Sequence, residues 1–250
     1  GLDGLMFARR NVLSGIINGL DYEEYNPLTD PHIDYHFSER DAVEGKRLNK
    51  KKFQEAAGIS VDENAMLIGI ISRLTDQKGF DLVAYVMDEM LSTMNVQLAI
   101  LGTGESRYEN MFHYFQNKYP VKVYVHIGYS EKKAHQIYAS CDAFLMPSLF
   151  EPCGLSQLIS MRYGTVPIVR ETGGLKDTVE PYNEYTQTGT GFSFRNYNAH
   201  DMLHVIRYAK QTFDNDKPSW KGIMERGMDM NFSWNASAGR YEELYNRLTE

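Results

Sequence analysis

The stretch SLFEPCGLSQ, residues 148–157, contains the side chain with the clearest potential for chemistry in this sequence, Glu151. It joins an apolar run typical of a strand, CDAFLMP, to a run with helical spacing, LSQLISMRYG. A helix start generally needs only Ser, Thr, Asp or Asn as its cap. A carboxylate at this joint therefore indicates a partner of the helix dipole, a metal ligand or a sugar ligand.

A second joint between a strand and a helix, SRLTDQKG, carries two cations. Arg73 follows the strand and Lys78 precedes the helix, where backbone N–H groups and the helix dipole favour an anion. A forked arginine and a lysine point charge together suit a pyrophosphate. Two surface cations that flank a turn are the alternative.

The loop LGTGESR raises the question of a dinucleotide site. Gly102 and Gly104 can let a nucleotide approach the backbone. However, Arg107 stands where the dinucleotide fingerprint needs its last glycine. This loop is compatible with a nucleotide but disfavours NAD and, with it, a dehydrogenase.

Two further loops follow strands and precede helices. HIGYSEKKA presents Tyr129, which can stack on a base or pack in the core, and Ser130, which is expected to cap a helix. RETGGLKD carries Thr172, Gly173 and Gly174. The paired glycines indicate either a close approach to a ligand or a tight turn.

Metal motifs are weak in this sequence. The seven histidines include no H-E-x-x-H pattern, and His200 and His204, four residues apart, have no third ligand in view, so a surface pair is favoured. Asp214 and Asp216 have the D-x-D form of metal-dependent glycosyltransferases, but they fall in a loop and are expected to form a solvated turn. We therefore expect no metal and no cofactor.

These loops need a scaffold, and the chain supplies one from Ala65 onward. Apolar runs typical of buried strands occupy 65–72, 96–102, 121–128, 141–147, 165–171 and 190–194, with helical patterns between them. This alternation predicts an α/β fold: a Rossmann-like doubly wound parallel sheet with helices on both faces. Ligands of such sheets bind beyond the carboxyl ends of the strands, where all five loops are expected.

The composition of the 250 residues is that of a soluble globular protein, with 42% hydrophobic residues and a net charge of −7 that argues against nucleic-acid binding. The basic run Lys46–Lys52 is expected to form the solvated side of a short helix. Cys141 and Cys153 are too few for a disulfide framework and are expected to be buried thiols in a reducing compartment. No run is long enough to span a membrane and no signal peptide is recognised, so a cytoplasmic protein is expected.

Taken together, the loops resemble those of the bacterial and plant-type glycogen (starch) synthases. The matching stretches are SRLTDQKG, HIGYSE, FEPCGLSQL and RYGTVPIVRETGGLKDTV, and the head of the chain is similar to the linker of that family. The resemblance implies the C-terminal, donor-binding half of a two-domain glycosyltransferase fold (GT-B type). It divides the chain into an interdomain linker at 1–45, a Rossmann-like nucleotide-sugar-binding domain at 46–230, and a C-terminal helix at 231–250 that would cross back to the missing N-terminal domain.

The activity that the resemblance implies is retaining transfer of glucose from ADP-glucose to the non-reducing end of an α-1,4-glucan. The partners would be the nucleotide sugar and the α-glucan acceptor, the latter held through the missing domain, with no nucleic acid and no membrane. The isolated chain is then expected to be inactive. A stand-alone module that binds a nucleotide or nucleotide sugar without turnover is the alternative, and UDP-glucose stays open as the donor.

Residue roles follow from the same resemblance. Arg73 and Lys78 would hold the diphosphate, Tyr129 would pack on the adenine, and Glu151 would face the glucosyl unit as a catalytic group together with the two cations. Ile159 replaces a ribose-gripping glutamate of many relatives, which fits the glycogen synthase branch. The remaining donor contacts would come from glycine turns and from a cradle of backbone N–H groups at a helix start: Gly102, Gly104, Cys153, Gly154, Leu155, Ser156, Thr172, Gly173 and Gly174.

Overall fold

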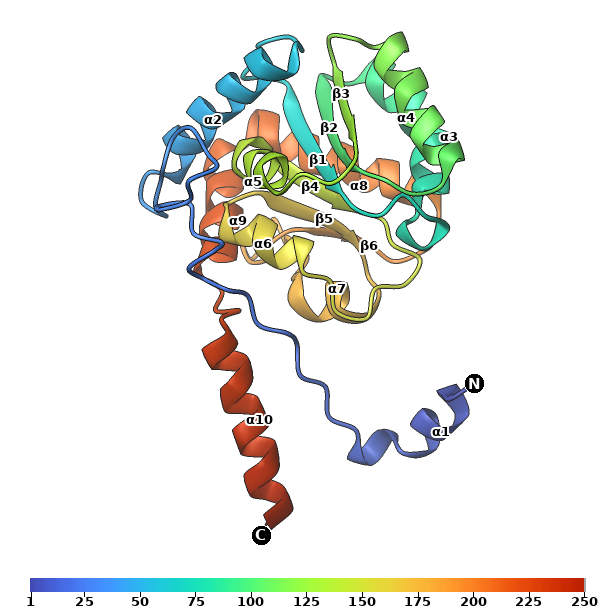
Figure 1. The fold of residues 1–250 in the computed structure, drawn as a ribbon, viewed down its shortest axis with the longest axis vertical. Helices are drawn as coiled ribbons and strands as arrows, with labels where there is room; N and C mark the ends of the chain where they lie inside the picture. The colour runs from blue at the N-terminus through green and yellow to red at the C-terminus, as the bar shows by residue number, and fades with distance from the viewer. Residues whose placement is uncertain (250) are drawn as a thin grey trace.

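The computed structural model describes residues 1–249 and shows a layered α/β body from which both ends of the chain project (Figure 1). Six parallel strands form one sheet in the order β3–β2–β1–β4–β5–β6. They are β1 (Met66–Ile71), β2 (Val96–Gly102), β3 (Val123–Ile127), β4 (Ala143–Met146), β5 (Val166–Arg170) and β6 (Phe192–Phe194). Each strand lies inside the apolar run that predicted it, and the doubly wound Rossmann-like fold is confirmed.

Helices connect the strands and cover both faces of the sheet. Helix α3 packs against α4 and α8, whereas α5 packs against α2 and α6 on the opposite face (Figure 1). The main helices are α2 (Ala42–Ala57), α3 (Phe80–Thr93), α4 (Ser106–Lys118), α5 (Glu131–Ser140), α6 (Ser156–Arg162), α7 (Gly173–Thr178), α8 (Ala199–Asn215), α9 (Lys217–Asp229) and α10 (Trp234–Thr249). None of the helices within residues 1–249 combines the length and apolar character that a bilayer span requires.

The burial of the strands follows from this layering. All seven residues of β2 and five of the six in β1 are buried. Strands covered by helices on both faces must be apolar on both sides, which explains why these runs are nearly continuous rather than alternating. In α3, the residues on one face pack on the sheet, including Leu82, Val86 and Met90.

The head of the chain, expected to be an interdomain linker, begins with two short helices, α1 (Asp3–Ala8) and η1 (Arg10–Val12). Turns follow until α2 begins at Ala42. Three helices, α8, α9 and α10, follow β6 without a further strand. The last of them, α10, lies within the stretch 231–250 that was expected to be helical, although Glu250 lies outside the described residues. Figure 1 shows α1 and α10 extending away from the body.

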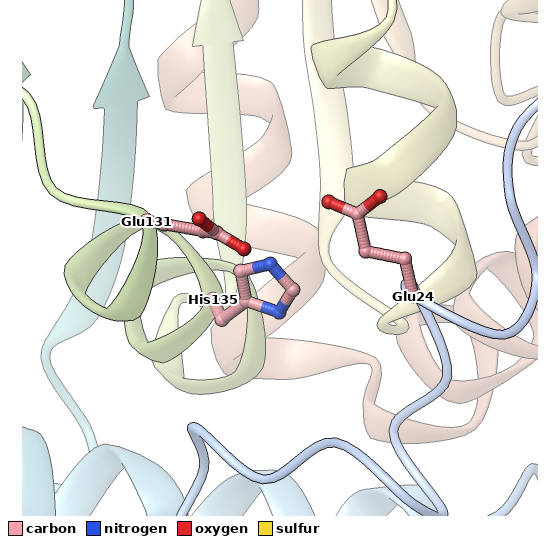
Figure 2. Close-up of side chains that lie close together, drawn as sticks. All are labelled: Glu24, Glu131 and His135. Carbon is pink, nitrogen blue, oxygen red and sulfur yellow. The ribbon is translucent and has the colours of Figure 1, made fainter.

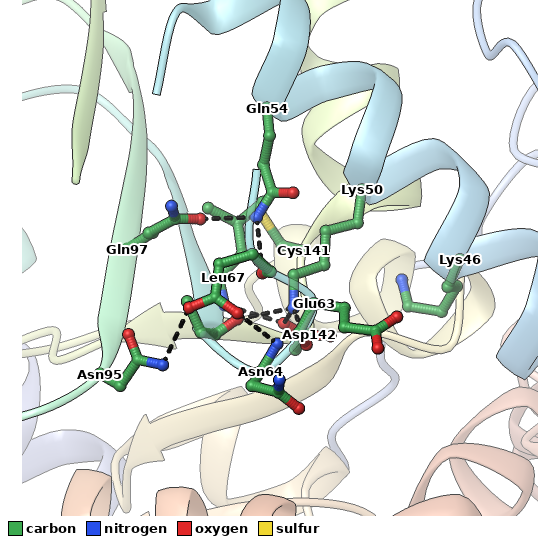
Figure 3. Close-up of polar contacts among 12 residues, drawn as sticks. Lys46, Lys50, Gln54, Glu63, Asn64, Leu67, Asn95, Gln97, Cys141 and Asp142 are labelled. Carbon is green, nitrogen blue, oxygen red and sulfur yellow. Dashed lines mark hydrogen bonds and ion pairs between the residues drawn. The ribbon is translucent and has the colours of Figure 1, made fainter. Parts of the chain in front are cut away.

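The prediction that Lys46–Lys52 forms the solvated side of a helix is wrong for two of its four lysines. The run lies on α2, but Lys46 and Lys50 are only 5% and 3% exposed. Lys50 Nζ pairs with Asp142 Oδ2 at 2.7 Å and donates to two backbone carbonyls at 2.6 and 3.0 Å (Figure 3). The charge pattern of a helix cannot reveal a partner that lies on the sheet.

Lys46 is buried without a carboxylate partner. Its Nζ donates to the carbonyls of Tyr138 and Ala139, both at 3.2 Å, and to Thr165 Oγ1 at 2.6 Å. Burial disfavours the charged form and lowers the pKa of Lys46 to about 8. The fold therefore favours the neutral amine relative to the unfolded chain.

We expect Lys46→Met to change how stability depends on pH. Between the lowered pKa of about 8 and the ordinary value of 10.5, the unfolded chain binds one more proton at Lys46 than the folded chain. The free energy of unfolding should therefore rise with pH in this window, by at most about 1.4 kcal/mol per pH unit. Denaturant unfolding at several pH values should show this rise in the wild type and in Lys51→Met, whose lysine is exposed on the same helix. An equal rise in Lys46→Met would contradict the assignment.

Candidate functional site

A cavity of about 140 Å³ opens between the carboxyl ends of β1 and β4. The two strands pair only through Ile68↔Ala143 and Gly69↔Phe144, and they separate beyond these residues. The strand order reverses at this point, which is where open parallel sheets bind their ligands. The polar part of the cavity lining comes from Ser72, Arg73, Lys78, Ser148 and Ser156.

Lys78 and Glu151 form an ion pair beside this cavity. Lys78 Nζ lies 2.5 Å from Glu151 Oε2, and the two side chains are only 16% and 10% exposed. Ser148 Oγ donates a second hydrogen bond to the same carboxylate oxygen at 3.3 Å. Arg73, in contrast, is exposed, and the ion pairs found among residues 1–249 do not include it. The site thus combines one free cation with one cation that is already paired.

Gly79 allows Lys78 to reach Glu151. It ends the short helix η2 (Asp76–Lys78) with a φ of +76°, and a Cβ at this position would lie 2.1 Å from the carbonyl oxygen of Pro147. Only glycine permits this left-handed turn against the end of β4. Gln77 extends the contact, since its carbonyl accepts from the Leu149 N–H at 2.8 Å.

The loop after Glu151 presents backbone N–H groups at the start of α6. Gln157 Nε2 donates to the carbonyls of Cys153 and Gly154, both at 3.0 Å. Among the hydrogen bonds of residues 1–249, none uses the N–H groups of Cys153, Gly154 or Leu155. The carbonyls of this loop are therefore engaged within the protein, and its N–H donors are available to a ligand.

The paired glycines at the start of α7 pack against this same loop. A Cβ at Gly173 would lie 2.2 Å from the carbonyl oxygen of Glu151, and one at Gly174 would lie 2.1 Å from that of Cys153. The Gly174 N–H also donates to the Glu151 carbonyl at 3.0 Å. Thr172 directly precedes the pair. These glycines therefore allow α7 to pack closely against the backbone of the loop that contains Glu151 and Cys153.

The other residues predicted for the site lie along the same edge of the sheet. Tyr129 is 88% exposed, which excludes the core as its location. Gly102 ends β2 and Gly104 follows it, and both lie beside the segment after β1. Ser130 caps α5, because its Oγ accepts from the Lys133 N–H at 3.3 Å, as predicted.

The sequence analysis also made predictions for residues that do not line the cavity. His200 and His204 are exposed on α8, as predicted for a surface pair. Asp214 pairs with Lys210, and Asp216 caps α9. Of the two thiols expected to be buried, Cys141 is buried but Cys153 is only half-buried, because it lies in the loop at the sheet edge.

Arg170 is a site-supporting residue that the sequence analysis missed. Its Nη1 donates to the carbonyls of Ser148 and Leu149 at 3.2 and 2.7 Å, and its guanidinium lies 5.4 Å from the centre of the Tyr197 ring. Arg170 therefore holds the segment that leads to Glu151. In the sequence, Arg170 could have been recognised as the charged residue that ends the otherwise apolar strand VPIVR.

We expect Gly174→Ala to destabilise the protein by about 1–3 kcal/mol, because the added Cβ must displace the loop that it contacts. Gly239→Ala is the control, since a Cβ at Gly239 on α10 meets nothing within 4 Å. This control should be neutral or stabilising by up to about 1 kcal/mol. Denaturant unfolding measures both, and equal stabilities of the two variants would show that the Gly174 contact is unimportant.

Comparison with known proteins gives a consistent set of relatives. The family model described as Glycosyl transferases group 1 matches residues 50–213. A protein named glycogen synthase from Lachnospira eligens is 61% identical over 247 residues, which are 99% of this chain and 52% of that protein. A glycogen synthase from Lachnoclostridium phytofermentans is 56% identical over 248 residues, with the same coverages of 99% and 52%. The chain spans about half the length of the curated relatives it matches.

Solved structures agree with these matches. The catalytic domain of starch synthase IV from Arabidopsis thaliana, bound to ADP and acarbose, superposes with a TM-score of 0.89 at 34% identity, covering 98% of this chain and 51% of that one. HepE from Anabaena, solved with UDP-glucose, superposes with a TM-score of 0.68 at 18% identity, covering 96% of this chain and 58% of its own. The second similarity concerns the fold alone.

Proposed function

Because this chain belongs to the group 1 glycosyl transferases, we propose that it is the C-terminal, donor-binding half of a glycogen synthase. The whole enzyme would transfer glucose from ADP-glucose, with retention, to the non-reducing end of an α-1,4-glucan. The ion pair between Lys78 and Glu151 beside the cavity is the observation that carries this proposal. The relatives named glycogen synthase and the neighbour solved with ADP and acarbose support it.

Arg73 and Lys78 would bind the diphosphate of the donor. As the glycosidic bond breaks, the leaving nucleotide gains negative charge, and fixed cations stabilise that charge without having to reorganise. Lys78 has three N–H donors, so it can keep its bond to Glu151 and still donate to a phosphate oxygen. Arg73 offers a fork that suits two phosphate oxygens.

Glu151 would face the glucosyl unit. A carboxylate held by Lys78 and Ser148 keeps a fixed position, from which it can accept from sugar hydroxyls and oppose the positive charge that develops near the anomeric carbon. The free N–H groups of Cys153, Gly154 and Leu155, with the Ser156 hydroxyl, would complete the contacts to hydroxyls and phosphate. In this proposal the cations stabilise the leaving nucleotide, and the carboxylate interacts with the sugar.

The rim of the site would hold the nucleoside. Tyr129 is exposed at the end of β3 and offers a face on which adenine can stack. Gly102 and Gly104 would let the nucleotide pass close to the backbone, and Thr172 with Gly173 and Gly174 would close the opposite side. No metal is needed in this proposal, since the two cations take the role that a divalent ion plays elsewhere.

The acceptor would be bound by another part of the full-length enzyme. Apolar side chains are exposed near the proposed site at Leu149, Phe150 and Leu155, and along the projecting α10 at Tyr245 and Leu248 (Figure 1). We assign 1–45 as the linker to that part, 46–230 as the donor domain and 231–250 as the helix that crosses back. Glucan extension by the 250-residue chain alone would contradict this division.

We expect Arg73→Ala and Lys78→Ala each to weaken ADP binding. Each variant removes a charge-assisted contact of about 1.5–3 kcal/mol, equivalent to about a 10- to 150-fold rise in Kd. Calorimetric titration with ADP measures the loss, and Lys52→Ala, an exposed lysine on α2, should leave the Kd unchanged. Unchanged ADP affinity in both site variants, or tight binding of NAD without binding of ADP, would refute the donor assignment.

Glu151→Gln should separate binding from catalysis. ADP carries no glucosyl unit and Lys78 keeps its charge, so the Kd for ADP should not rise, whereas turnover of the full-length enzyme should fall by about 10²-fold or more. Glu184→Gln, an exposed residue in the loop before β6, serves as the control. Normal turnover in Glu151→Gln would remove this residue from the mechanism.

A further inference from the structure

A second group of possible ligands lies outside the proposed donor site. Glu24, Glu131 and His135 each offer one ligand atom, and these atoms lie within 4.8 Å of one another. Glu131 and His135 are one helical turn apart on α5, and Glu24 comes from the turn that precedes α2 in the N-terminal segment. In Figure 2 one nitrogen of the His135 ring points toward both carboxylates.

The buried imidazole is the unusual member of this group. His135 is 2% exposed, and its Nε2 is a buried atom without a hydrogen-bond partner within residues 1–249. The ring is held in place by a stacking contact with Tyr25, whose ring centre lies 5.1 Å away, and by Asp30, whose Oδ2 lies 2.7 Å from Nδ1. A buried polar atom without a partner costs free energy, so a missing ligand is indicated.

The surroundings of Asp30 define which ring nitrogen carries the hydrogen. Tyr163 Oη donates to Asp30 Oδ2 at 2.5 Å, and the His32 N–H donates to Oδ1 at 2.8 Å. Carboxylate oxygens accept hydrogen bonds, so the Nδ1–H of His135 donates to Asp30 Oδ2.

In the neutral ring this arrangement leaves the lone pair on Nε2, which faces two further acceptors (Figure 2). Glu24 and Glu131 are both exposed carboxylates, and neither can donate a hydrogen bond when ionised. Three acceptor atoms within 4.8 Å of one another form a set that a cation can bind, because carboxylates and an imidazole lone pair are all metal ligands. A histidine whose second nitrogen donates to a carboxylate is also the usual arrangement of a metal-binding imidazole.

We propose that Glu24, Glu131 and His135 form a binding site for Zn²⁺, with water as the fourth ligand and Asp30 as the positioning residue. One imidazole and two carboxylates form a donor set that zinc accepts. Tetrahedral bonds of about 2.0–2.2 Å place ligand atoms about 3.4 Å apart, so the side chains must close by about an ångström. The two exposed glutamates can make this change by rotation.

The ion would join the N-terminal segment to the body of the protein. Glu24 lies in that segment, whereas the other two ligands lie on α5, which begins two residues after Tyr129. The site would thus fix the path of the segment without contributing to transfer. It departs from the expectation of no metal. Metal motifs in a sequence consist of ligands close together in the chain, whereas Glu24 is distant from α5.

The test is a titration of the metal-free chain with Zn²⁺, followed by calorimetry and by thermal unfolding. We expect one tightly bound ion and a Tm that rises with zinc concentration. Glu24→Gln and Glu131→Gln should each weaken binding by at least about tenfold. Glu23→Gln, the neighbouring exposed glutamate in the same turn, should bind like the wild type.

Two outcomes would overturn the proposal. The first is an equal zinc affinity in the wild type and the Glu24→Gln/Glu131→Gln double variant, which would locate the ion elsewhere, for example at His200 and His204. The second is the absence of zinc binding to the wild type. Both glutamates are exposed, so these variants are expected to fold and the comparison does not rest on replacing His135.

Discussion

The pairing of β1 with β4 is the contact on which the proposed donor site depends. Asp142 joins the two strands where they begin: its Oδ2 accepts from Lys50 Nζ at 2.7 Å and from the Leu67 N–H at 2.8 Å, and its own N–H donates to the Leu67 carbonyl at 2.8 Å (Figure 3). The register then lasts for two residue pairs before the strands diverge. A firm junction at the amino ends thus permits an opening at the carboxyl ends. The buried lysine that looked like surface charge in the sequence is part of this junction.

The segment that carries Glu151 is held from three sides. Arg170 binds its preceding carbonyls from the end of β5, Gly174 donates to the Glu151 carbonyl from α7, and Gln77 contacts it from η2. The role proposed for Glu151 needs a carboxylate whose position is fixed before the substrate arrives. The loop is therefore irregular in conformation but well supported, which is the arrangement expected of a binding loop on a rigid sheet.

The fold could be predicted from the sequence because its strands and helices are determined mainly by residues that are close together in the chain. Apolar runs and helical spacing depend on neighbours in the chain, so the strands, the helices and the edge on which the loops gather could all be derived. The pairing of Lys78 with Glu151, the burial of Lys50 against Asp142 and the free nitrogen of His135 could not. Each of these features depends on residues from elements that are distant in the chain. The type of a side chain does not reveal which distant residue it will contact. The resemblance to glycogen synthases supplied roles for residues, whereas the contacts among those residues came only from the structure.

The ion pair between Lys78 and Glu151 also has a kinetic consequence. In the free protein the carboxylate offsets the charge of Lys78, and Arg73 remains as the exposed cation at the cavity. A nucleotide diphosphate that diffuses toward the site would first be attracted mainly by one charge rather than two. Ionic strength should then act on the rate of encounter chiefly through Arg73, while the lifetime of the complex depends on both cations. Association and dissociation would thus respond to different residues of the same phosphate site.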